Sequence, residues 1–348
     1  TAALLTMALA GNVQAAEIRS VGPDGEAAVD ASTIELTDDQ IAQIKEGGYT
    51  AAICLHYGGN DWSTSQQKGL EDTFGELGIE IVAVTDANFS AETQVSNIET
   101  VMAKKPDILV SIPTDATATA DAYKQAAAAG IKIVFMDQRA DGLEAGKDYV
   151  SVVSADNYGN GYASGTVLGD ALGGKGKVAM VYYDANFAPT NQRDEGFRDA
   201  MKNYPDIEIV TEQGFTDESG CAEQGDAILT QFPNIDGIYA SWDVPMEGVL
   251  SAVRAAGMEG KVTLACNDLG NNVAREIASG NIAGGGAQMP YDQGVAEAKL
   301  AALALLGEET PSYVAVPAET VTHENVLEAY TDVYHVETPD WLKEAYVD

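Results

Sequence analysis

The chain has 348 residues, 45% of them hydrophobic, which is long enough for two domains with packed cores. Its 54 acidic and 19 basic residues give a formal net charge of −35, which argues against binding to nucleic acid or to an anionic membrane surface. The acidic excess is typical of a solvated surface and does not by itself indicate a cation site.

The first 16 residues resemble a targeting segment rather than part of a fold. Residues 2–11 are apolar and about as long as a signal-peptide core, and small residues at 13–16 suit cleavage. We predict that 1–16 is the remnant of a signal peptide, with a short buried helix as the alternative. No later run reaches the roughly 18 apolar residues of a membrane-spanning helix. The sequence therefore predicts an exported, periplasmic protein without direct membrane insertion.

Residues 17–48 form an acidic N-terminal extension that we expect to pack on the first domain, with a short helix over 38–45. From residue 50 the pattern alternates regularly. Strands are predicted at 51–56, 79–85, 107–112 and 131–136, and helices at 63–77, 91–104 and 117–129. Ser63 or Thr64 is the predicted helix cap. Strands that alternate with helices predict a parallel sheet with right-handed crossovers.

The same pattern then repeats. Gly196 follows Gly69 by 127 residues, and the strand at 178–183 repeats that at 51–56 with the same offset. Asp268 ends a later strand as Asp137 ends an earlier one. A nearly constant offset over several elements predicts two similar α/β lobes.

The lobes are expected to be joined by several segments. Residues 150–161 have the pattern of a strand that leads into a hinge and then a helix, and further crossings are expected near Gln288 and Pro317. A long helix at 291–306 and a strand at 312–317 lie between these crossings. We predict an α/β fold of two doubly wound parallel-sheet lobes joined by three hinge segments. The expected ranges are 49–154 plus 289–317 for the N-terminal lobe, 155–288 plus 318–335 for the C-terminal lobe, and 336–348 for a tail.

Motifs of common enzymes and metal sites do not appear in the sequence. It contains no GxSxG, Walker or HExxH motif, and His56, His323 and His335 are scattered. Cys54 and Cys266 lie in strand-like runs and are expected in the core, with a Cys221–Cys266 disulfide as the alternative. We therefore predict no catalytic residues, no cofactor and no metal.

Polar and aromatic residues instead gather where strands end, at the edge where open α/β sheets bind ligands. They are Asn60, Trp62, Asp137, Gln138, Arg193, Trp242, Asp243, Asp268 and Gln288. Carboxylates accept hydrogen bonds from hydroxyls, arginine donates them, and indole rings stack on the C–H face of a sugar. This combination predicts a site for an uncharged polyol between the lobes.

Each of these residues also has a structural alternative. Asp243 and Asp268 precede probable helices and have the side chain of a helix cap. The two tryptophans have the size typical of core residues. Arg193 has many surface acids available as ion-pair partners. His56, at a strand end, either touches a ligand or is a buried, hydrogen-bonded core residue.

Over about residues 49–330 the sequence resembles the type I periplasmic sugar-binding proteins, the ribose-binding-like substrate-binding proteins of ABC transporters. The residues that carry the resemblance are N-D-W-S (60–63), F-M-D-Q (135–138), S-A-D-N-Y-G-N-G (154–161), R-D-E-G-F (193–197), W-D (242–243), N-D-L-G (267–270), A-Q-M-P-Y-D-Q-G (287–294) and T-V-T-H-E-N-V (320–326). The resemblance implies two lobes that close on a sugar, an inner-membrane ABC permease as partner, and a monomer. It adds Ser63 to the ligand-binding residues.

Some positions depart from the ribose-type pattern. Gln138 stands where Arg is common, Trp242 where Asn is common, Thr216 where an aromatic residue is expected, and Ala155 where a hydroxyl is expected. A bulky indole at 242 and an uncharged side chain at 138 favour a small neutral ligand, namely a pentose or a linear polyol of four or five carbons.

Three other functions compete with this one. A chemotaxis or signalling binding protein is compatible with the same residues, and an enzyme on this scaffold is the less favoured alternative. A sugar-responsive repressor needs a basic helix-turn-helix, whereas residues 1–48 are acidic and show none.

Overall fold

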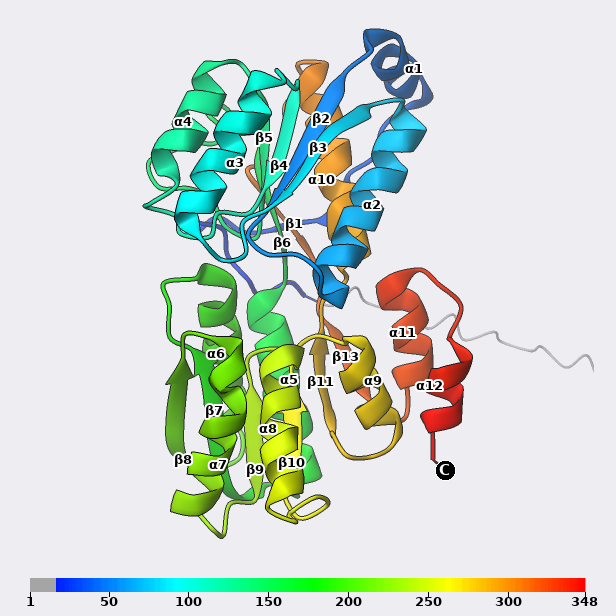
Figure 1. The fold of residues 1–348 in the computed structure, drawn as a ribbon. Helices are drawn as coiled ribbons and strands as arrows, with labels where there is room; N and C mark the ends of the chain where they lie inside the picture. The colour runs from blue at the N-terminus through cyan, green and yellow to red at the C-terminus, as the bar shows by residue number, and fades with distance from the viewer. Residues whose placement is uncertain (1–16, 348) are drawn as a thin grey trace, which may run out of the picture.

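The structure, a computed structural model, describes residues 17–347 and consists of two α/β lobes stacked one above the other (Figure 1). The predicted fold class is confirmed. The predicted signal-peptide remnant, 1–16, lies outside the described residues. Within 17–347, none of the helices combines the length and apolar character needed to span a bilayer.

The first lobe is built on a seven-stranded, all-parallel sheet in the order β1-β12-β6-β5-β4-β2-β3. Its strands are β1 (Val29–Asp30), β2 (Thr50–Leu55), β3 (Glu80–Asp86), β4 (Ile108–Ser111), β5 (Lys132–Met136), β6 (Ser151–Ala155) and β12 (Tyr313–Val316). Its helices are α1 (Asp38–Gly47), α2 (Asp61–Leu77), α3 (Ala91–Ala103), α4 (Ala120–Ala128) and α10 (Pro290–Leu305). Two apolar clusters, one with α2 and α10 and the other with α3 and α4, cover opposite faces of the sheet. Burial on both faces explains why these strands read as continuous apolar runs.

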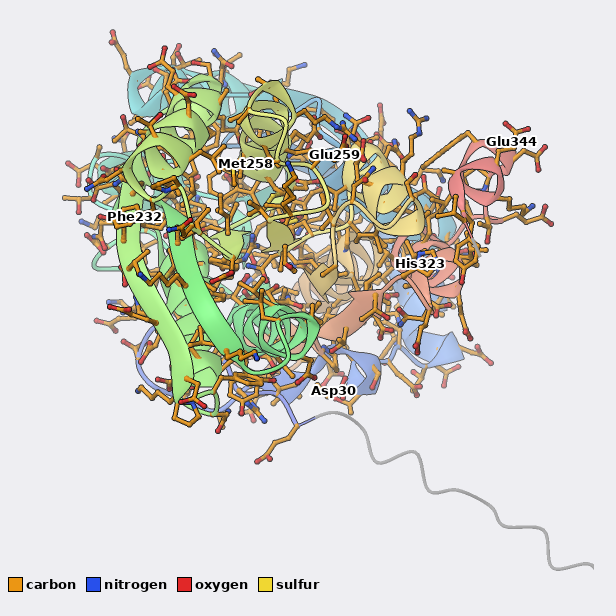
Figure 2. The ribbon with its side chains drawn as sticks, turned by 90° about the horizontal axis from the view of Figure 1, so that it is seen from below. Asp30, Phe232, Met258, Glu259, His323 and Glu344 are labelled. Atoms are coloured by element: carbon orange, nitrogen blue, oxygen red, sulfur yellow. The ribbon has the colours of Figure 1, made fainter. Side chains whose placement is uncertain are left out.

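The second lobe has a six-stranded sheet in the order β13-β11-β10-β9-β7-β8, with β13 antiparallel to β11. Its strands are β7 (Lys175–Tyr183), β8 (Asp206–Phe215), β9 (Gly237–Ala240), β10 (Thr263–Cys266), β11 (Gly284–Ala287) and β13 (Glu319–Thr322). Its helices are α5 (Asn157–Ala171), α6 (Ala188–Met201), α7 (Cys221–Gln231), α8 (Asp243–Ala255), α9 (Asn271–Ala278), α11 (Val326–Tyr334) and α12 (Asp340–Ala345). Seen from below, side chains fill the layers between this sheet and its helices (Figure 2).

The repeated glycines mark the same close helix crossing in each lobe. A Cβ atom at Gly69 on α2 would lie 2.2 Å from the backbone oxygen of Tyr291 on α10. A Cβ atom at Gly196 on α6 would lie 2.1 Å from the backbone oxygen of Tyr158 on α5. Only a residue without a side chain permits helices to approach so closely, which gives the 127-residue offset a physical reason.

The chain crosses between the lobes three times, as predicted: from β6 to α5 at Asp156, from β11 to α10 at Gln288, and from β12 to β13 at Pro317. The Asp156 carboxylate accepts hydrogen bonds from the backbone N–H of Gly159 at 2.9 Å and of Ser20 at 2.8 Å. It therefore caps α5 and also fixes the N-terminal extension at the hinge.

The N-terminal extension and the C-terminal tail differ from expectation. The extension contacts both lobes, because Arg19 lies over the Tyr162 ring of α5, 4.1 Å from its centroid, while Asp24 pairs with Arg139 of the first lobe at 2.7 Å. The predicted tail contains α12, at the edge of the second lobe, and its Leu342 is fully buried in that lobe's core. The three cysteines are buried and free, so the alternative disulfide is not formed.

Candidate ligand-binding site

A cavity lies between the lobes at the carboxyl ends of both sheets, with about 460 Å³ of unfilled space including its mouth. From the first lobe it is lined by His56, Tyr57, Asn60, Trp62, Phe89, Ile112 and Asp137. From the second lobe and the hinge it is lined by Tyr183, Phe187, Pro189, Thr190, Arg193, Trp242, Asp268 and Gln288.

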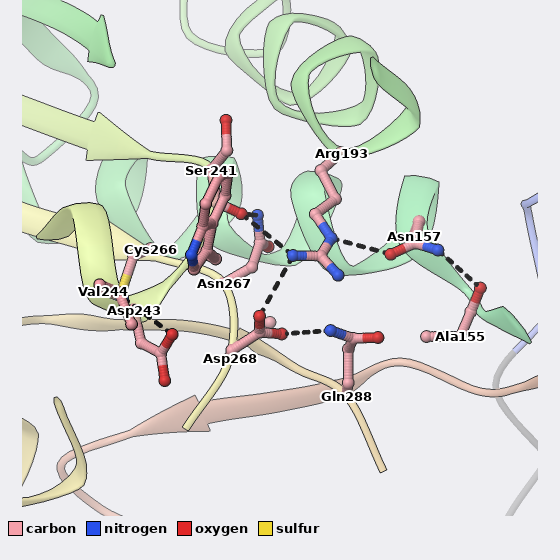
Figure 3. A network of polar contacts seen from close by, with 12 residues as sticks. Ala155, Asn157, Arg193, Ser241, Asp243, Val244, Cys266, Asn267, Asp268 and Gln288 are labelled. Carbon is pink, nitrogen blue, oxygen red and sulfur yellow. Dashed lines mark hydrogen bonds and ion pairs between the residues drawn. The ribbon is translucent and has the colours of Figure 1, made fainter. Parts of the chain in front are cut away.

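Arg193 is the positive centre of the cavity, and its charge is already paired (Figure 3). Its Nη1 atom lies 3.2 Å from Asp268 Oδ2, and its Nε atom donates to Asn157 Oδ1 at 2.8 Å. Gln288 Nε2 donates to the other oxygen of Asp268 at 2.7 Å. Only 6% of the Arg193 side chain and 9% of the Asp268 side chain are exposed, so solvent screens this pair little. A cavity whose cation is neutralised in this way favours an uncharged ligand.

Asp137 and Asp268 occupy matching places in the two lobes. Asp137 directly follows β5, and Asp268 lies two residues beyond the end of β10. Both have a left-handed backbone, with φ of +54° for Asp137 and +69° for Asp268. Aspartate tolerates this conformation better than most residues, and such outliers cluster at functional sites. Ser154 donates to Asp137 at 2.8 Å, and burial raises the pKa of Asp137.

Aromatic rings supply the apolar part of the cavity. Tyr57 stacks on Phe89 with ring centroids 4.2 Å apart, and Tyr183 meets Trp242 edge-on at 5.6 Å. His56 stacks on Phe187 of the other lobe at 5.7 Å. Burial lowers the pKa of His56 to about 3, so the imidazole is uncharged at neutral pH.

Some buried polar atoms of the lining have no hydrogen-bond partner among residues 17–347. They are Trp62 Nε1, Gln288 Oε1 and His56 Nδ1. Buried polar groups are nearly always hydrogen-bonded, and an unmade bond is costly. The indole N–H of Trp62 is a donor and the side-chain oxygen of Gln288 is an acceptor, and both belong to residues that line the cavity.

A second buried acid lies behind the arginine. Asp194, the next residue on α6, accepts a hydrogen bond from Ser241 Oγ at 2.6 Å and a longer one from Tyr239 at 3.3 Å. Burial raises the pKa of Asp194 to about 7. It is absent from the cavity lining and supports the wall from which Arg193 projects.

Seven of the ten predicted site residues meet in this cavity: Asn60, Trp62, Asp137, Arg193, Trp242, Asp268 and Gln288. The other three, Ser63, Gln138 and Asp243, are buried but do not line it. Ser63 donates through its backbone N–H to Asn60 Oδ1 at 2.8 Å, so Asn60, rather than Ser63 or Thr64, is the cap of α2.

Helix capping, surface pairing and core packing do not by themselves account for the candidate aspartates, arginine and tryptophans. Asp268 does not cap α9, which begins at Asn271 after Gly270, and Asp243 lies inside α8 as its first residue. Arg193 has a buried partner rather than a surface acid, and it lies in the second turn of α6 instead of opening that helix. The tryptophans belong to the cores and also line the cavity.

Sequence reasoning missed most of the aromatic lining. Tyr183 stands 127 residues after His56, so the repeat itself carried a signal for it. Phe89 and Phe187 lie in loops that follow β3 and β7, at the same edge of the sheets. These residues also lie at the edge where open α/β sheets bind ligands. An isolated aromatic residue in a loop, however, belongs to no sequence motif that would mark it as a site residue.

Comparisons with known proteins agree with this architecture. A family model described as a periplasmic binding protein domain matches residues 51–309. The D-ribose/D-allose-binding protein of Pseudomonas aeruginosa is 29% identical over 273 residues, covering 75% of this chain and 83% of that protein. The ribose import binding protein of Bacillus subtilis is 27% identical over 213 residues, covering 61% and 67%.

Among solved structures, an ABC transporter periplasmic solute binding protein from Actinobacillus succinogenes with bound D-allose has a TM-score of 0.74 at 29% identity. The match covers 80% of this chain and 99% of that one. Because the family match extends over strands and helices of both lobes, the chain belongs to the periplasmic binding proteins, in their type I sugar-binding branch.

Proposed function

We propose that this protein is the periplasmic solute-binding component of an ABC importer and that it binds a small neutral monosaccharide or polyol between its lobes. The ligand class comprises pentoses, tetritols and pentitols. The observation that carries the proposal is the composition of the cavity. Its arginine is paired with an aspartate, its free polar atoms are neutral, and aromatic rings come from both lobes.

We assign the ligand contacts to the seven predicted residues that line the cavity. Arg193 and Trp62 offer N–H donors, whereas Asp137 and Gln288 offer oxygen acceptors. Trp242 packs against the apolar face of the ligand and limits its size. Asp268 holds Arg193 and Gln288 in place through hydrogen bonds to both.

Ligand contacts on both lobes stabilise the closed arrangement, and an inner-membrane permease recognises the closed lobes. The relatives named above are binding proteins, two for ribose or allose and one with allose bound. We therefore propose binding without turnover.

A thermal-shift screen against pentoses, hexoses, tetritols and pentitols tests the proposal. A ligand at a hundred times its Kd stabilises a protein by about 2.7 kcal/mol, a shift that such a screen detects. Calorimetry then gives the affinity, and chromatography of the recovered sugar tests for turnover. The proposal fails if no sugar or polyol at millimolar concentration stabilises the protein, or if the bound sugar is converted.

A further inference from the structure

Several helices of the second lobe begin without a side-chain cap from the preceding residue, and two of them, α9 and α6, are capped from the first lobe. In α9, which starts at Asn271, and in α6, which starts at Ala188, the preceding residue makes no side-chain hydrogen bond to the first turn. The first N–H groups of a helix have no partner within the helix and need an acceptor elsewhere. For both helices the first N–H finds its acceptor on a side chain of the first lobe.

The acceptor for α9 is Asp61. The backbone N–H of Asn271 donates to Asp61 Oδ2 at 2.7 Å, and its side-chain Nδ2 donates to Asp61 Oδ1 at 2.8 Å. Tyr330 of α11 donates to the Asn271 side-chain oxygen at 2.6 Å and so holds the amide in this orientation. Asp61 is also the first residue of α2, so its carboxylate lies between the N-termini of two helices, where negative charge is stabilised.

The acceptor for α6 is Gln138. The backbone N–H of Ala188 donates to Gln138 Oε1 at 3.2 Å, and Gln138 Nε2 donates to Pro113 of the first lobe at 2.8 Å. The next residue of α6, Pro189, has no N–H, so Ala188 carries the first orphan donor of this helix. The two contacts reach helices that lie on opposite sides of the second lobe (Figure 1).

We propose that Asp61 and Gln138 act as interlobe caps, that is, first-lobe side chains that cap α9 and α6 only when the lobes are together. The inference rests on the proposed function, in which the lobes close on a ligand. Neither residue lines the cavity, so each stabilises the closed form without touching the ligand. They are positioning residues that scale the affinity for all ligands equally and leave the selectivity to the cavity.

The experiment compares Asp61→Ala, Gln138→Ala and the double variant with the matched control Glu71→Ala. Glu71 is an exposed acid on the same helix as Asp61, and its one hydrogen bond among the described residues is to Gln67 of that helix. Removal of a helix N-cap changes an equilibrium by about twofold to thirtyfold. We therefore expect each of the two single variants to lower the ratio of closed to open forms by a factor in that range.

Two readouts are needed. Small-angle scattering of the ligand-free proteins measures the open population, and the radius of gyration should grow for the double variant but not for Glu71→Ala. Titration with D-ribose, D-allose and D-arabinose should show every measurable Kd raised by the same factor, through faster dissociation. If no sugar binds, the proposed function fails while the scattering still decides this inference.

The inference is overturned if the double variant scatters like Glu71→Ala and binds each sugar with native affinity. It is also overturned for Gln138 if Gln138→Ala changes the ranking of the sugars, because that result marks a ligand contact. Asp61→Asn retains an acceptor for the Asn271 backbone but places two amide groups face to face, so its effect should be intermediate.

Discussion

Replacement of Asp268 by asparagine tests whether the paired arginine organises the ligand site. Asp268 has φ of +69°, a left-handed conformation that asparagine adopts readily and that costs alanine roughly 1–2 kcal/mol. Asp268→Asn therefore removes the negative charge and one acceptor while it leaves the backbone unstrained. The change in sugar affinity therefore reports on the hydrogen bonds that Asp268 makes, and not on backbone strain.

The magnitude follows from the two contacts that are lost or inverted. Asp268 accepts from Arg193 Nη1 at 3.2 Å and from Gln288 Nε2 at 2.7 Å. Asparagine has a single acceptor oxygen, so one of these donors then faces an NH₂ group. A hydrogen bond to a charged group contributes about 1.5–3 kcal/mol, and its full loss from the ligand-bound form alone raises Kd by roughly 10- to 150-fold. Because the ligand-free protein also loses the bond, that range is the upper limit of the expected effect.

Isothermal titration calorimetry with the best sugar from the screen measures the change, and circular dichroism verifies the fold. Asp243→Asn is the matched control, because Asp243 is buried near Asp268 but does not line the cavity. Burial raises the pKa of Asp243, and because its side chain does not line the cavity, Asp243→Asn should bind sugar like the native protein. A Kd for Asp268→Asn within twofold of that of Asp243→Asn refutes the assigned role.

Three further outcomes are expected. Gly69→Ala should lower the free energy of unfolding by about 1–3 kcal/mol, because the added Cβ atom meets the Tyr291 backbone. Gly75→Ala on the same helix adds its Cβ atom to open space and should not lower it. Equal urea midpoints for the two variants contradict this prediction. The folded pKa of Asp194, about 7, exceeds the unfolded value, so stability is lost as pH rises from about 4 through 7. Asp194→Asn should therefore raise Tm at about pH 8 but not at about pH 4, and parallel Tm–pH curves argue against it. Trp62→Phe keeps an aromatic ring but removes the unpartnered Nε1 donor, so affinity should fall by roughly 2- to 10-fold, and unchanged titration curves contradict a ligand bond there.

The repeat made much of the fold predictable. Parallel strands buried on both faces leave apolar runs. Gly69 and Gly196 are required because a Cβ atom at either position would lie within 2.2 Å of a backbone oxygen of the facing helix, so both signals recur with the 127-residue offset. Asp137 and Asp268, 131 residues apart, follow corresponding strands of the two lobes, and both line the cavity. Polar side chains at strand ends are visible in a sequence because they interrupt the apolar runs at the edge where such sheets bind ligands.

Other features could not be predicted. The cap of α9 comes from Asp61, more than 200 positions away, and no local pattern records a contact between lobes. Gln138 follows Asp137 at a strand end, yet its side chain turns to Pro113 and Ala188 instead of the cavity. Adjacent residues at such an edge point in different directions, and only the fold decides which one faces the ligand.

The three crossings between the lobes have a consequence for how the protein is made. Helix α10 and strand β12 complete the first lobe, but they follow β11 of the second lobe in the chain. A nascent chain that has reached residue 287 therefore leaves apolar surface of α2 without its partner helix, and β13 and α11 of the second lobe are also still missing. Neither lobe has all of its strands and helices until almost the whole polypeptide has been synthesised. We therefore expect both lobes to complete their folding at about the same time.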